Sequence, residues 1–319
     1  MNDEGARRAL ARFGIDPMLL QVPALARQRK RAVWRAGGFA LKWLSVQAQA
    51  EKVAAVSRHL HEREIPVPVP LEPGVVQMEG GCFLLFPWID GVQPGYGGPG
   101  ELEGITALLA RFHRASAGYV AGGGPVDRWM LDWERLWSDR RHELHKLAAR
   151  AAQVNDAFSL RLRPALPWLR DRIRWCQKEL PRTGAARMAQ LSLADPLLGH
   201  GDYSRQNLLA RPDGSLVVID LDQTNVSLRV RDLSRLISWA DHDLQSWSGE
   251  RFHRMLRFYG DLAPAEVDLL CLDQVMPHLA IDIARDYYNQ ARETHLEELE
   301  RCLGTDRVKL ADLGCGPRP

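Results

Sequence analysis

The sequence predicts a two-lobed α+β fold, with a small mixed β/α N-terminal lobe and a larger, mainly helical C-terminal lobe. Three observations support this prediction. The chain has 319 residues, more than one hydrophobic core usually supports. Two candidate β-hairpins flank a candidate helix early in the chain, and apolar residues recur mostly at helical spacing farther on. We therefore expect an N-terminal lobe over residues 1–90 and a C-terminal lobe over residues 91–319.

The expected N-terminal lobe has elements with clear boundaries. Glycines separate the strands of each hairpin, and prolines at positions 66, 68 and 70 prevent the second helix from continuing. In chain order the elements are a helix over 4–13, a hairpin of 32–35 and 39–44, a helix over 46–63, and a hairpin of 75–77 and 82–86. Lys42 lies in a strand between apolar residues, where a charge is costly unless it has an anionic partner.

The expected C-terminal lobe begins after a Gly- and Pro-rich joint at residues 95–100. Apolar residues at helical spacing predict helices over 102–119, 133–153 and 159–179. We expect the tail from Leu303 to Pro319 to be frayed, because it ends in Gly and Pro.

The most informative segment runs from His200 to Asn207 and continues to Asp220. A Pro-Asp-Gly turn separates two short apolar runs, which predicts a hairpin over 208–219. Antiparallel pairing would return Asn207 to within about one residue of lying opposite Asp220. An amide oxygen and a carboxylate would then converge on a site suited to Mg²⁺, with Asp202 beside them to orient a substrate hydroxyl. These are the parts of an ATP-dependent phosphotransferase.

The motif His-Gly-Asp-x4-Asn, followed by a strand that ends in Ile-Asp, resembles the aminoglycoside-phosphotransferase branch of the protein-kinase-like fold. Several further segments resemble the spore-coat CotS group within that branch. These segments are Ala32-Val33-Trp34-Arg35, Phe39-Ala40-Leu41-Lys42, residues 109–119 and Met276-Pro277-His278. The resemblance implies a bilobal kinase-like fold that uses ATP and Mg²⁺.

The resemblance also implies roles for individual residues. Asp202 would be the catalytic base or hydroxyl-positioning group, and Asn207 and Asp220 would be the metal ligands. His200 would brace the loop. For Asp222 two interpretations stay open, a contact with the water shell of the metal and a purely structural role.

Nucleotide contacts are expected from both lobes. In the family, a strand lysine contacts the α and β phosphates and a helix glutamate holds it, which points to Lys42 and Glu51. Pro87 and Trp88 lie where an apolar strand runs into Pro and Gly, which suits a hinge whose backbone groups hydrogen-bond adenine. Arg205 is a candidate contact for the transferring phosphoryl group.

The sequence departs from the protein-kinase pattern at two places. The G-x-G-x-x-G loop is absent from residues 24–41, which leaves backbone amides of residues 28–32 as a guess for the phosphate cover. Ser204 stands where Ser/Thr kinases usually have a lysine, which favours a small-molecule hydroxyl acceptor. Asp241, His242 and Asp243 are candidate acceptor contacts. An acidic acceptor pocket would favour amines, whereas a neutral one would favour sugars.

Two other function classes stay open. One is a weakly active or inactive kinase-like protein that acts as a spore-coat component or scaffold through protein contacts. The other is a metal-dependent hydrolase built on His200, Asp202, Asp220 and Asp222, which the absence of a second nearby histidine weakens.

Composition limits the partners. A net charge of +2 argues against electrostatic binding of nucleic acid. The five cysteines show no C-x-x-C spacing, which argues against a zinc site and a disulfide framework. No apolar run is long enough to span a bilayer, and the N-terminus does not resemble a signal peptide. We expect a cytoplasmic protein whose partners are a nucleotide and a hydroxyl-bearing acceptor, with spore-coat proteins as the alternative.

Overall fold

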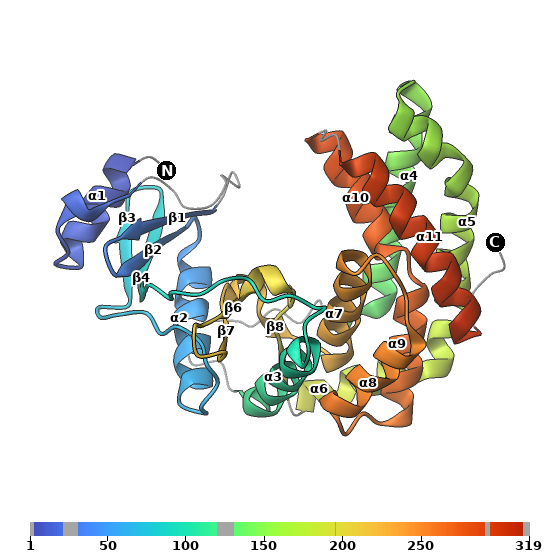
Figure 1. The fold of residues 1–319 in the computed structure, drawn as a ribbon. Coiled ribbons are helices and arrows are strands. Elements are labelled where there is room, and N and C mark those ends of the chain that lie inside the picture. The colour runs from blue at the N-terminus through green and yellow to red at the C-terminus, as the bar shows by residue number, and fades with distance from the viewer. Residues whose placement is uncertain (1–2, 22–30, 120–130, 195, 291–293, 315–319) are drawn as a thin grey trace. The chain divides into compact units, whose positions relative to one another are not determined.

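The computed structural model describes residues 3–21, 31–119, 131–194, 196–290 and 294–314 (Figure 1). The chain forms two compact units. Unit 1 consists of Met1–Pro94, Arg111–Asp127 and Pro196–Asn225, and unit 2 consists of Gly95–Ala110, Arg128–Asp195 and Val226–Pro319. The expected lobe boundary between residues 90 and 91 stays a prediction.

Unit 1 contains a four-stranded antiparallel sheet in the order β1-β2-β4-β3. The strands are β1 (Arg31–Ala36), β2 (Phe39–Leu44), β3 (Val75–Met78) and β4 (Gly81–Pro87). Gly37 joins β1 to β2 with a φ of 59°, a left-handed conformation that favours glycine. Both predicted hairpins are therefore confirmed, each with its partner strand in register.

Two helices cover opposite faces of this sheet, α1 (Asp3–Arg12) and α2 (Gln47–His61). Successive residues of a strand point to opposite faces, so the burial pattern separates two apolar clusters. The α1 cluster contains Ala6, Ala9, Leu10, Trp34, Leu41, Trp43, Phe83 and Leu85. The α2 cluster contains Leu44, Ala50, Val53, Ala54, Cys82, Leu84 and Phe86. Lys42 has the parity of Leu44, so its side chain lies on the face that α2 covers.

The rest of unit 1 carries the predicted motif. Its short elements are η1 (Pro17–Leu19), β5 (Leu198–Gly199), η4 (Arg205–Asn207), β6 (Leu208–Ala210), β7 (Leu216–Val218), η5 (Leu221–Gln223) and the start of β8 (Asn225–Val226). The helix α3 (Glu101–Ser116) is shared between the two units. Strands β6 and β7 pair antiparallel, which confirms the third predicted hairpin.

The described part of unit 2 is mainly helical. Its helices are α4 (Trp133–Gln153), α5 (Ala157–Glu179), η3 (Leu180–Thr183), α6 (Ala185–Ala194), α7 (Arg229–Asp243), α8 (Gly249–Tyr259), α9 (Pro264–Val275), α10 (His278–Asn289) and α11 (His295–Leu313). The antiparallel helices α4 and α5 pack on each other, and α10 and α11 pack against them. The predicted combination of a small mixed N-terminal lobe and a helical remainder is thus confirmed.

The prediction of a frayed tail from Leu303 was wrong for most of that segment. Residues up to Leu313 belong to α11, because Leu303 and Leu310 recur at helical spacing and are buried. Gly314 ends the helix with a φ of 61°. Residues 315–319 lie outside the described part of the chain.

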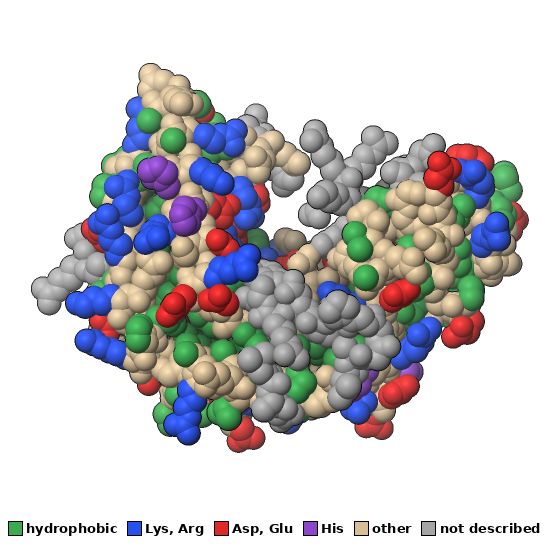
Figure 2. Space-filling model, turned by 180° about the vertical axis from the view of Figure 1, so that it is seen from behind, with side chains coloured by type: hydrophobic (Ala, Val, Ile, Leu, Met, Phe, Trp, Pro, Cys, Tyr) green, Lys and Arg blue, Asp and Glu red, His purple; other side chains and the backbone are tan. Residues whose placement is uncertain are grey.

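The surface of α4 and α5 is rich in basic side chains, which Figure 2 shows from behind. Exposed members of this group are Arg141, Lys146, Arg170, Arg174 and Lys178. The opposite faces of both helices carry apolar residues that are buried. This division between a polar and an apolar face is the pattern expected for helices on the edge of a helical bundle.

Within the described residues, no helix is both long and apolar enough to cross a membrane. Four cysteines fall in the described part, Cys82, Cys176, Cys271 and Cys302, and all four are free thiols.

Candidate active site

The β6–β7 hairpin brings Asn207 next to Asp220, as predicted. The register pairs Leu208 with Val218, so Asn207 lies opposite Ile219, one residue from Asp220. The Ile219 N–H donates to the Asn207 carbonyl at 2.9 Å, which extends the ladder by one step. Two residues that are thirteen positions apart in the sequence are therefore fixed beside each other by backbone pairing.

His200 braces the segment that carries Asp202. The imidazole is buried, and its Nδ1 accepts the backbone N–H of Asp202 at 3.3 Å. Because Nδ1 is an acceptor, Nε2 carries the proton, and it contacts the Ile219 carbonyl at 3.1 Å. Both ring nitrogens bond to backbone, so His200 is not placed to ligate a metal. This geometry argues against the hydrolase alternative.

Gly201 allows the same loop to pass close to the strand end. Its φ is 81°, and a Cβ at this position would lie 2.4 Å from the Gln223 carbonyl oxygen. Only glycine satisfies both the left-handed conformation and the close approach. The loop that carries Asp202 is therefore packed directly on the backbone that follows Asp220.

Asn207 is held in one orientation by Asp202. Its Nδ2 donates to the Asp202 carbonyl at 2.8 Å and to Asp202 Oδ2 at 3.0 Å. The amide nitrogen is thus committed to Asp202, which directs Oδ1 away from that residue. Asn207 is also buried, so its orientation is fixed by the fold.

Lys42 forms a buried cluster with two carboxylates. Its Nζ lies 2.7 Å from Asp220 Oδ1 and 2.6 Å from Asp222 Oδ1. The exposed fractions of the three side chains are 11% for Lys42, 35% for Asp220 and 0% for Asp222. Burial alone would lower the pKa of Lys42, but Asp222 and then Asp220 outweigh it, and the pKa lies above the ordinary 10.5. The lysine is therefore charged at neutral pH, and the anionic partner expected for it is present.

The expectation that Glu51 holds Lys42 is wrong. Among the described residues, Lys42 pairs with Asp220 and Asp222 and not with Glu51. Glu51 instead accepts a hydrogen bond from Gln47 at 2.7 Å, one turn earlier on α2. The two acids that follow β7 already neutralise Lys42, and Asp222, whose role was open, is one of them.

Lys52, one residue after Glu51, is the site residue that sequence reasoning missed. Its Nζ donates to the Thr224 carbonyl at 2.8 Å and to the Asp222 carbonyl at 3.2 Å. No local sequence pattern predicts this contact, because a charged residue on an amphipathic helix is usually expected to face the solvent. The residues that it meets lie 170 and 172 positions farther along the chain.

The segment after β4 is where backbone groups were expected to bond a nucleotide base. The Trp88 N–H is already bonded to the Gly38 carbonyl at 2.8 Å, so this amide is not one of the unpaired backbone groups that were expected to bond adenine. Because residues 38 and 88 form a hydrogen-bonded pair of the ladder, the Pro87 carbonyl points away from β2. In the described structure, the N–H groups of Ile89, Asp90 and Gly91 make no bond to protein. Pro87 thus supplies an acceptor, and the donors follow Trp88.

The expected roles of Arg205 and of the backbone amides at residues 28–32 stay predictions. Arg205 begins η4, two residues before Asn207, and its side chain is half-buried. Its role toward a phosphoryl group stays a prediction. The guess of backbone amides at residues 28–32 lies mostly outside the described residues.

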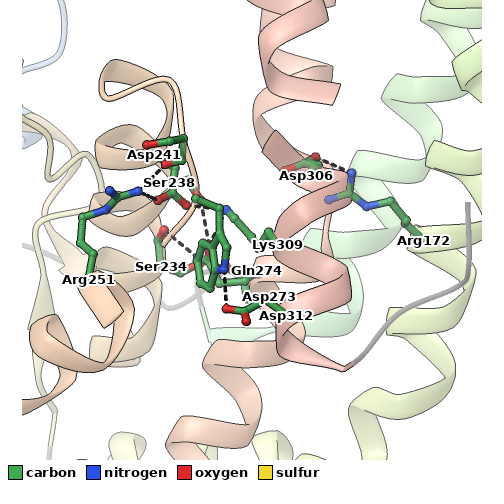
Figure 3. A network of polar contacts seen from close by, with 12 residues as sticks. Arg172, Ser234, Ser238, Asp241, Arg251, Asp273, Gln274, Asp306, Lys309 and Asp312 are labelled. Carbon is green, nitrogen blue, oxygen red and sulfur yellow. Dashed lines mark hydrogen bonds and ion pairs between the residues drawn. The ribbon is translucent and has the colours of Figure 1, made fainter. Parts of the chain in front are cut away.

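Of the acceptor candidates in unit 2, Asp241 belongs to a buried polar network (Figure 3). Asp241 Oδ1 accepts from Arg251 at 2.7 Å, and Asp241 Oδ2 lies 2.9 Å from Lys309 Nζ. Asp243 Oδ1 lies 3.3 Å from His242 Nδ1. Both oxygens of Asp241 are neutralised, so this residue does not create an acidic pocket for an amine.

A cavity beside this network is lined by residues that include Asp241, His242, Gln274 and Lys309. Its volume is about 20 Å³, room for a single water molecule. A cavity of this size does not hold a sugar or an aminoglycoside. The network is therefore best understood as a device that ties helices α7, α8, α9 and α11 together.

The oxygen donors near Asp220 fit a hard divalent cation. Asn207 Oδ1 and the Asp220 carboxylate are the ligand types that Mg²⁺ prefers, and Asp220 is partly exposed, which leaves room for water ligands. Among the described residues there is no group of three or more His, Cys, Asp or Glu side chains arranged to hold a metal. A site with one carboxylate and one amide needs oxygens from a bound phosphate to be completed, as is usual for Mg²⁺ in phosphotransferases.

Comparison with known proteins places this geometry in context. The model of the phosphotransferase enzyme family matches residues 40–270, a span that contains Lys42, Asp202, Asn207 and Asp220. The chain is 23% identical over 261 residues to spore coat protein S of Bacillus subtilis (strain 168), covering 75% of this chain and 71% of that protein.

Solved structures show the same fold. An aminoglycoside phosphotransferase from Alicyclobacillus acidocaldarius aligns with a TM-score of 0.68 and 18% identity, over 93% of this chain and 92% of that one. Spectinomycin phosphotransferase in complex with ADP and spectinomycin aligns with a TM-score of 0.62 and 14% identity, over 97% of each chain. The predicted bilobal kinase-like fold is confirmed, and the chain belongs to the phosphotransferase enzyme family.

Proposed function

We propose that the protein transfers the γ-phosphate of ATP, in a Mg²⁺-dependent reaction, to a hydroxyl group of a small-molecule acceptor. The observation that carries this proposal is the meeting of Lys42, Asp202, Asn207, Asp220 and Asp222 within unit 1. These groups come from β2, the loop after β5 and the residues after β7. A scaffold that binds no nucleotide would not require all of them.

The charge of the site supports a metal–nucleotide ligand. Lys42 carries one positive charge, and Asp220 and Asp222 together carry two negative charges. The cluster of Lys42, Asp220 and Asp222 therefore keeps one negative charge, and Asp220 is one residue from lying opposite Asn207, which favours a divalent cation. When bound, the metal would supply neutralisation of the charge on the phosphate oxygens. Lys42 would then hold the α and β phosphates.

Asp202 is proposed to orient the acceptor. Its carboxylate is held by Asn207, and the residue is partly exposed, as a group that meets a substrate must be. The acceptor oxygen forms a bond to the γ-phosphorus while the bond from that phosphorus to the bridging oxygen breaks. ADP leaves, and the hydroxyl proton passes to Asp202.

The base of the nucleotide is proposed to bond the segment after β4. The Pro87 carbonyl would accept from an exocyclic amine, and an N–H of residues 89–91 would donate to a ring nitrogen. This arrangement suits adenine, which offers one donor and one acceptor on adjacent positions.

The acceptor is proposed to be a small molecule, as the name of the spectinomycin phosphotransferase suggests for that protein. Spore coat protein S supports the other candidate by its name, a kinase-like protein with little or no activity that associates with the spore coat. Under either candidate the protein would act in the cytoplasm or at the coat. The candidates differ in whether the Asp202 carboxylate is used.

The test is nucleotide-induced thermal stabilisation, measured with ATP in Mg²⁺ and in EDTA. We expect wild type to gain several degrees only with Mg²⁺, because binding to the native state adds stability by mass action. Asp220→Ala should lose this gain. Asp202→Ala should keep it and lose phosphoryl transfer to a panel of sugars, aminoglycosides and choline. Asp139→Ala, an exposed acid on α4, is the control.

The outcomes separate the candidates. A metal-dependent gain without phosphate incorporation into any acceptor of the panel, or into coat proteins, would favour the coat-protein candidate. No metal-dependent gain at millimolar ATP would refute ATP–Mg²⁺ binding.

A further inference from the structure

The backbone that follows Asp220 is held by a helix on one side and by the loop after β5 on the other. The residues concerned are 221–225, here called the metal loop. On the helix side, Lys52 Nζ contacts the carbonyls of Thr224 at 2.8 Å and Asp222 at 3.2 Å, and Asn225 Oδ1 at 3.5 Å. Gln49, on the same face of α2, donates to the Asp222 carbonyl at 3.4 Å.

The acceptors of Lys52 are themselves fixed. Asn225 Nδ2 donates to the Gln223 carbonyl at 2.9 Å, which directs Asn225 Oδ1 toward Lys52. Thr224 is fully buried, so its carbonyl has no alternative exposure to bulk water. Charge-assisted bonds of this kind are shorter and stronger than bonds between neutral groups. They offset the entropy cost of ordering a lysine side chain.

Asp222 is consequently held at both ends by lysines. Its carboxylate pairs with Lys42 of β2, and its carbonyl accepts from Lys52 of α2. Asp220, two residues earlier, has a φ of 59°, a left-handed conformation that is uncommon for a residue with a side chain. Such a conformation persists only where surrounding contacts determine it. The contacts of Asp222 and Thr224 are the nearest ones on the C-terminal side.

The opposite side of the metal loop touches Gly201. The Gln223 carbonyl oxygen lies where a Cβ of Gly201 would be 2.4 Å away. Any shift of the metal loop toward or away from α2 would therefore change the spacing between Asp220 and the segment that carries Asp202.

We infer that Lys52 is a positioning residue, which holds the metal loop so that Asp220 is presented to the metal of the nucleotide complex. This inference rests on the proposed function. In this role Lys52 does not touch the nucleotide. It couples α2 to the metal site through backbone carbonyls, in the place where a pairing of Glu51 with Lys42 was expected.

The test compares Lys52→Met with Lys52→Arg. Met keeps the apolar stem and removes the ammonium, whereas Arg keeps donors that reach carbonyls. Lys146→Met, an exposed lysine on α4, is the matched control. Two quantities are measured for each variant. One is the Mg²⁺ concentration at half-maximal ATP-induced stabilisation, and the other is the ADP affinity in EDTA.

We expect Lys52→Met to raise the required Mg²⁺ concentration by about ten-fold, the low end of the effect of removing a direct partner of a metal ligand, because Lys52 acts through the backbone after Asp220; ADP affinity in EDTA should be unchanged. Lys52→Arg should recover most of the loss. Gln49→Ala, which removes only the 3.4 Å bond to the Asp222 carbonyl, should shift the Mg²⁺ requirement less and serves as the test if Lys52→Met fails to fold.

Three results would overturn the inference. The first is an unchanged Mg²⁺ requirement in Lys52→Met or, if that variant fails to fold, in Gln49→Ala. The second is a fall in ADP affinity in EDTA as large as the change in the Mg²⁺ requirement. The third is the same change in the control variant Lys146→Met. If wild type itself shows no Mg²⁺-dependent stabilisation, the proposed function fails and this inference with it. A Mg²⁺ requirement that is present in wild type and unchanged in the variants refutes the role of Lys52 alone.

Discussion

The cluster of Lys42, Asp220 and Asp222 makes a quantitative prediction about stability. Replacing Lys42 by Met removes the cation that pairs with the carboxylate of Asp222, and that side chain is 0% exposed, so water cannot take the place of the cation. At an effective dielectric of about 20, unit charges at the 2.7 Å that separates Lys42 from Asp220 attract by about 6 kcal/mol, most of which desolvation offsets. Asp220 is 35% exposed and can rehydrate, so Asp222 dominates the cost. We expect Lys42→Met to lower the free energy of unfolding by about 3 kcal/mol.

The partner variant should behave differently. Asp222→Asn removes one of two carboxylates that share a single ammonium, so we expect a loss of only about 1 kcal/mol. The double variant removes the buried charge and the cation together. It should be more stable than Lys42→Met alone by about 1–2 kcal/mol, a coupling of about 2–3 kcal/mol in a double-mutant cycle.

The assay is urea unfolding, followed by tryptophan fluorescence and by circular dichroism, with coincident transitions required for two-state treatment. Of the ten tryptophans of the chain, Trp34 and Trp43 are buried in the sheet that carries Lys42 and contribute the signal of that sheet. The reasoning would be refuted if the two single losses simply add in the double variant. Additivity would mean that Asp222 is not held by Lys42.

Two further predictions concern Gly201 and Asp273. Gly201→Ala should lower the free energy of unfolding by about 2 kcal/mol and lower turnover about a hundred-fold. Gly214 has a φ of 82° and open space around it, so Gly214→Ala should show only the stability cost of the backbone conformation. Steady-state turnover and urea unfolding of both variants distinguish the two cases. Asp273 is buried, and although burial raises the pKa of its carboxyl, the contacts of His278 and Ser234 lower it below the ordinary 3.8 overall. A carboxyl whose pKa is depressed in the folded state stabilises the fold above pH 3.8, and this contribution is lost as the pH falls through the folded pKa. The difference in unfolding free energy between wild type and Asp273→Asn should therefore be full at pH 7 and shrink below pH 4. A constant difference down to pH 3 would contradict this prediction.

How much of this structure can be predicted from sequence depends on the distance between the residues in contact. The hairpin that places Asn207 beside Asp220 is local, and its turn and apolar runs predict it to within one residue. The sheet hairpins and α2 are predictable for the same reason, since glycines and prolines mark their ends.

Long-range partners could not be predicted in this way. The cation of Lys42 implied an anionic partner, but not which one, because Asp220 is 178 residues away. The family resemblance predicts Glu51 as the partner of Lys42, whereas the packing of α2 places Lys52 against the metal loop. The helix α11 was missed because Gly and Pro at the chain end hid the apolar spacing of Leu303 and Leu310.

The unit 2 network shows the same limit. Asp241 was readable as a polar candidate, but its partners Arg251 and Lys309 come from α8 and α11, and only the packing of those helices shows that its charge is neutralised. A residue type suggests chemistry, and the neighbours decide whether that chemistry is available.

A metal shared by Asn207 and Asp220 is the central feature of the proposed site. The most direct measurement is a crystal structure with Mn²⁺ and a non-hydrolysable ATP analogue, using the anomalous signal of the metal. The account predicts an anomalous peak at about 2.2 Å from Asn207 Oδ1 and from the Asp220 carboxylate, with Lys42 on the α and β phosphates. A nucleotide bound in unit 1 with the metal peak away from both residues would contradict it.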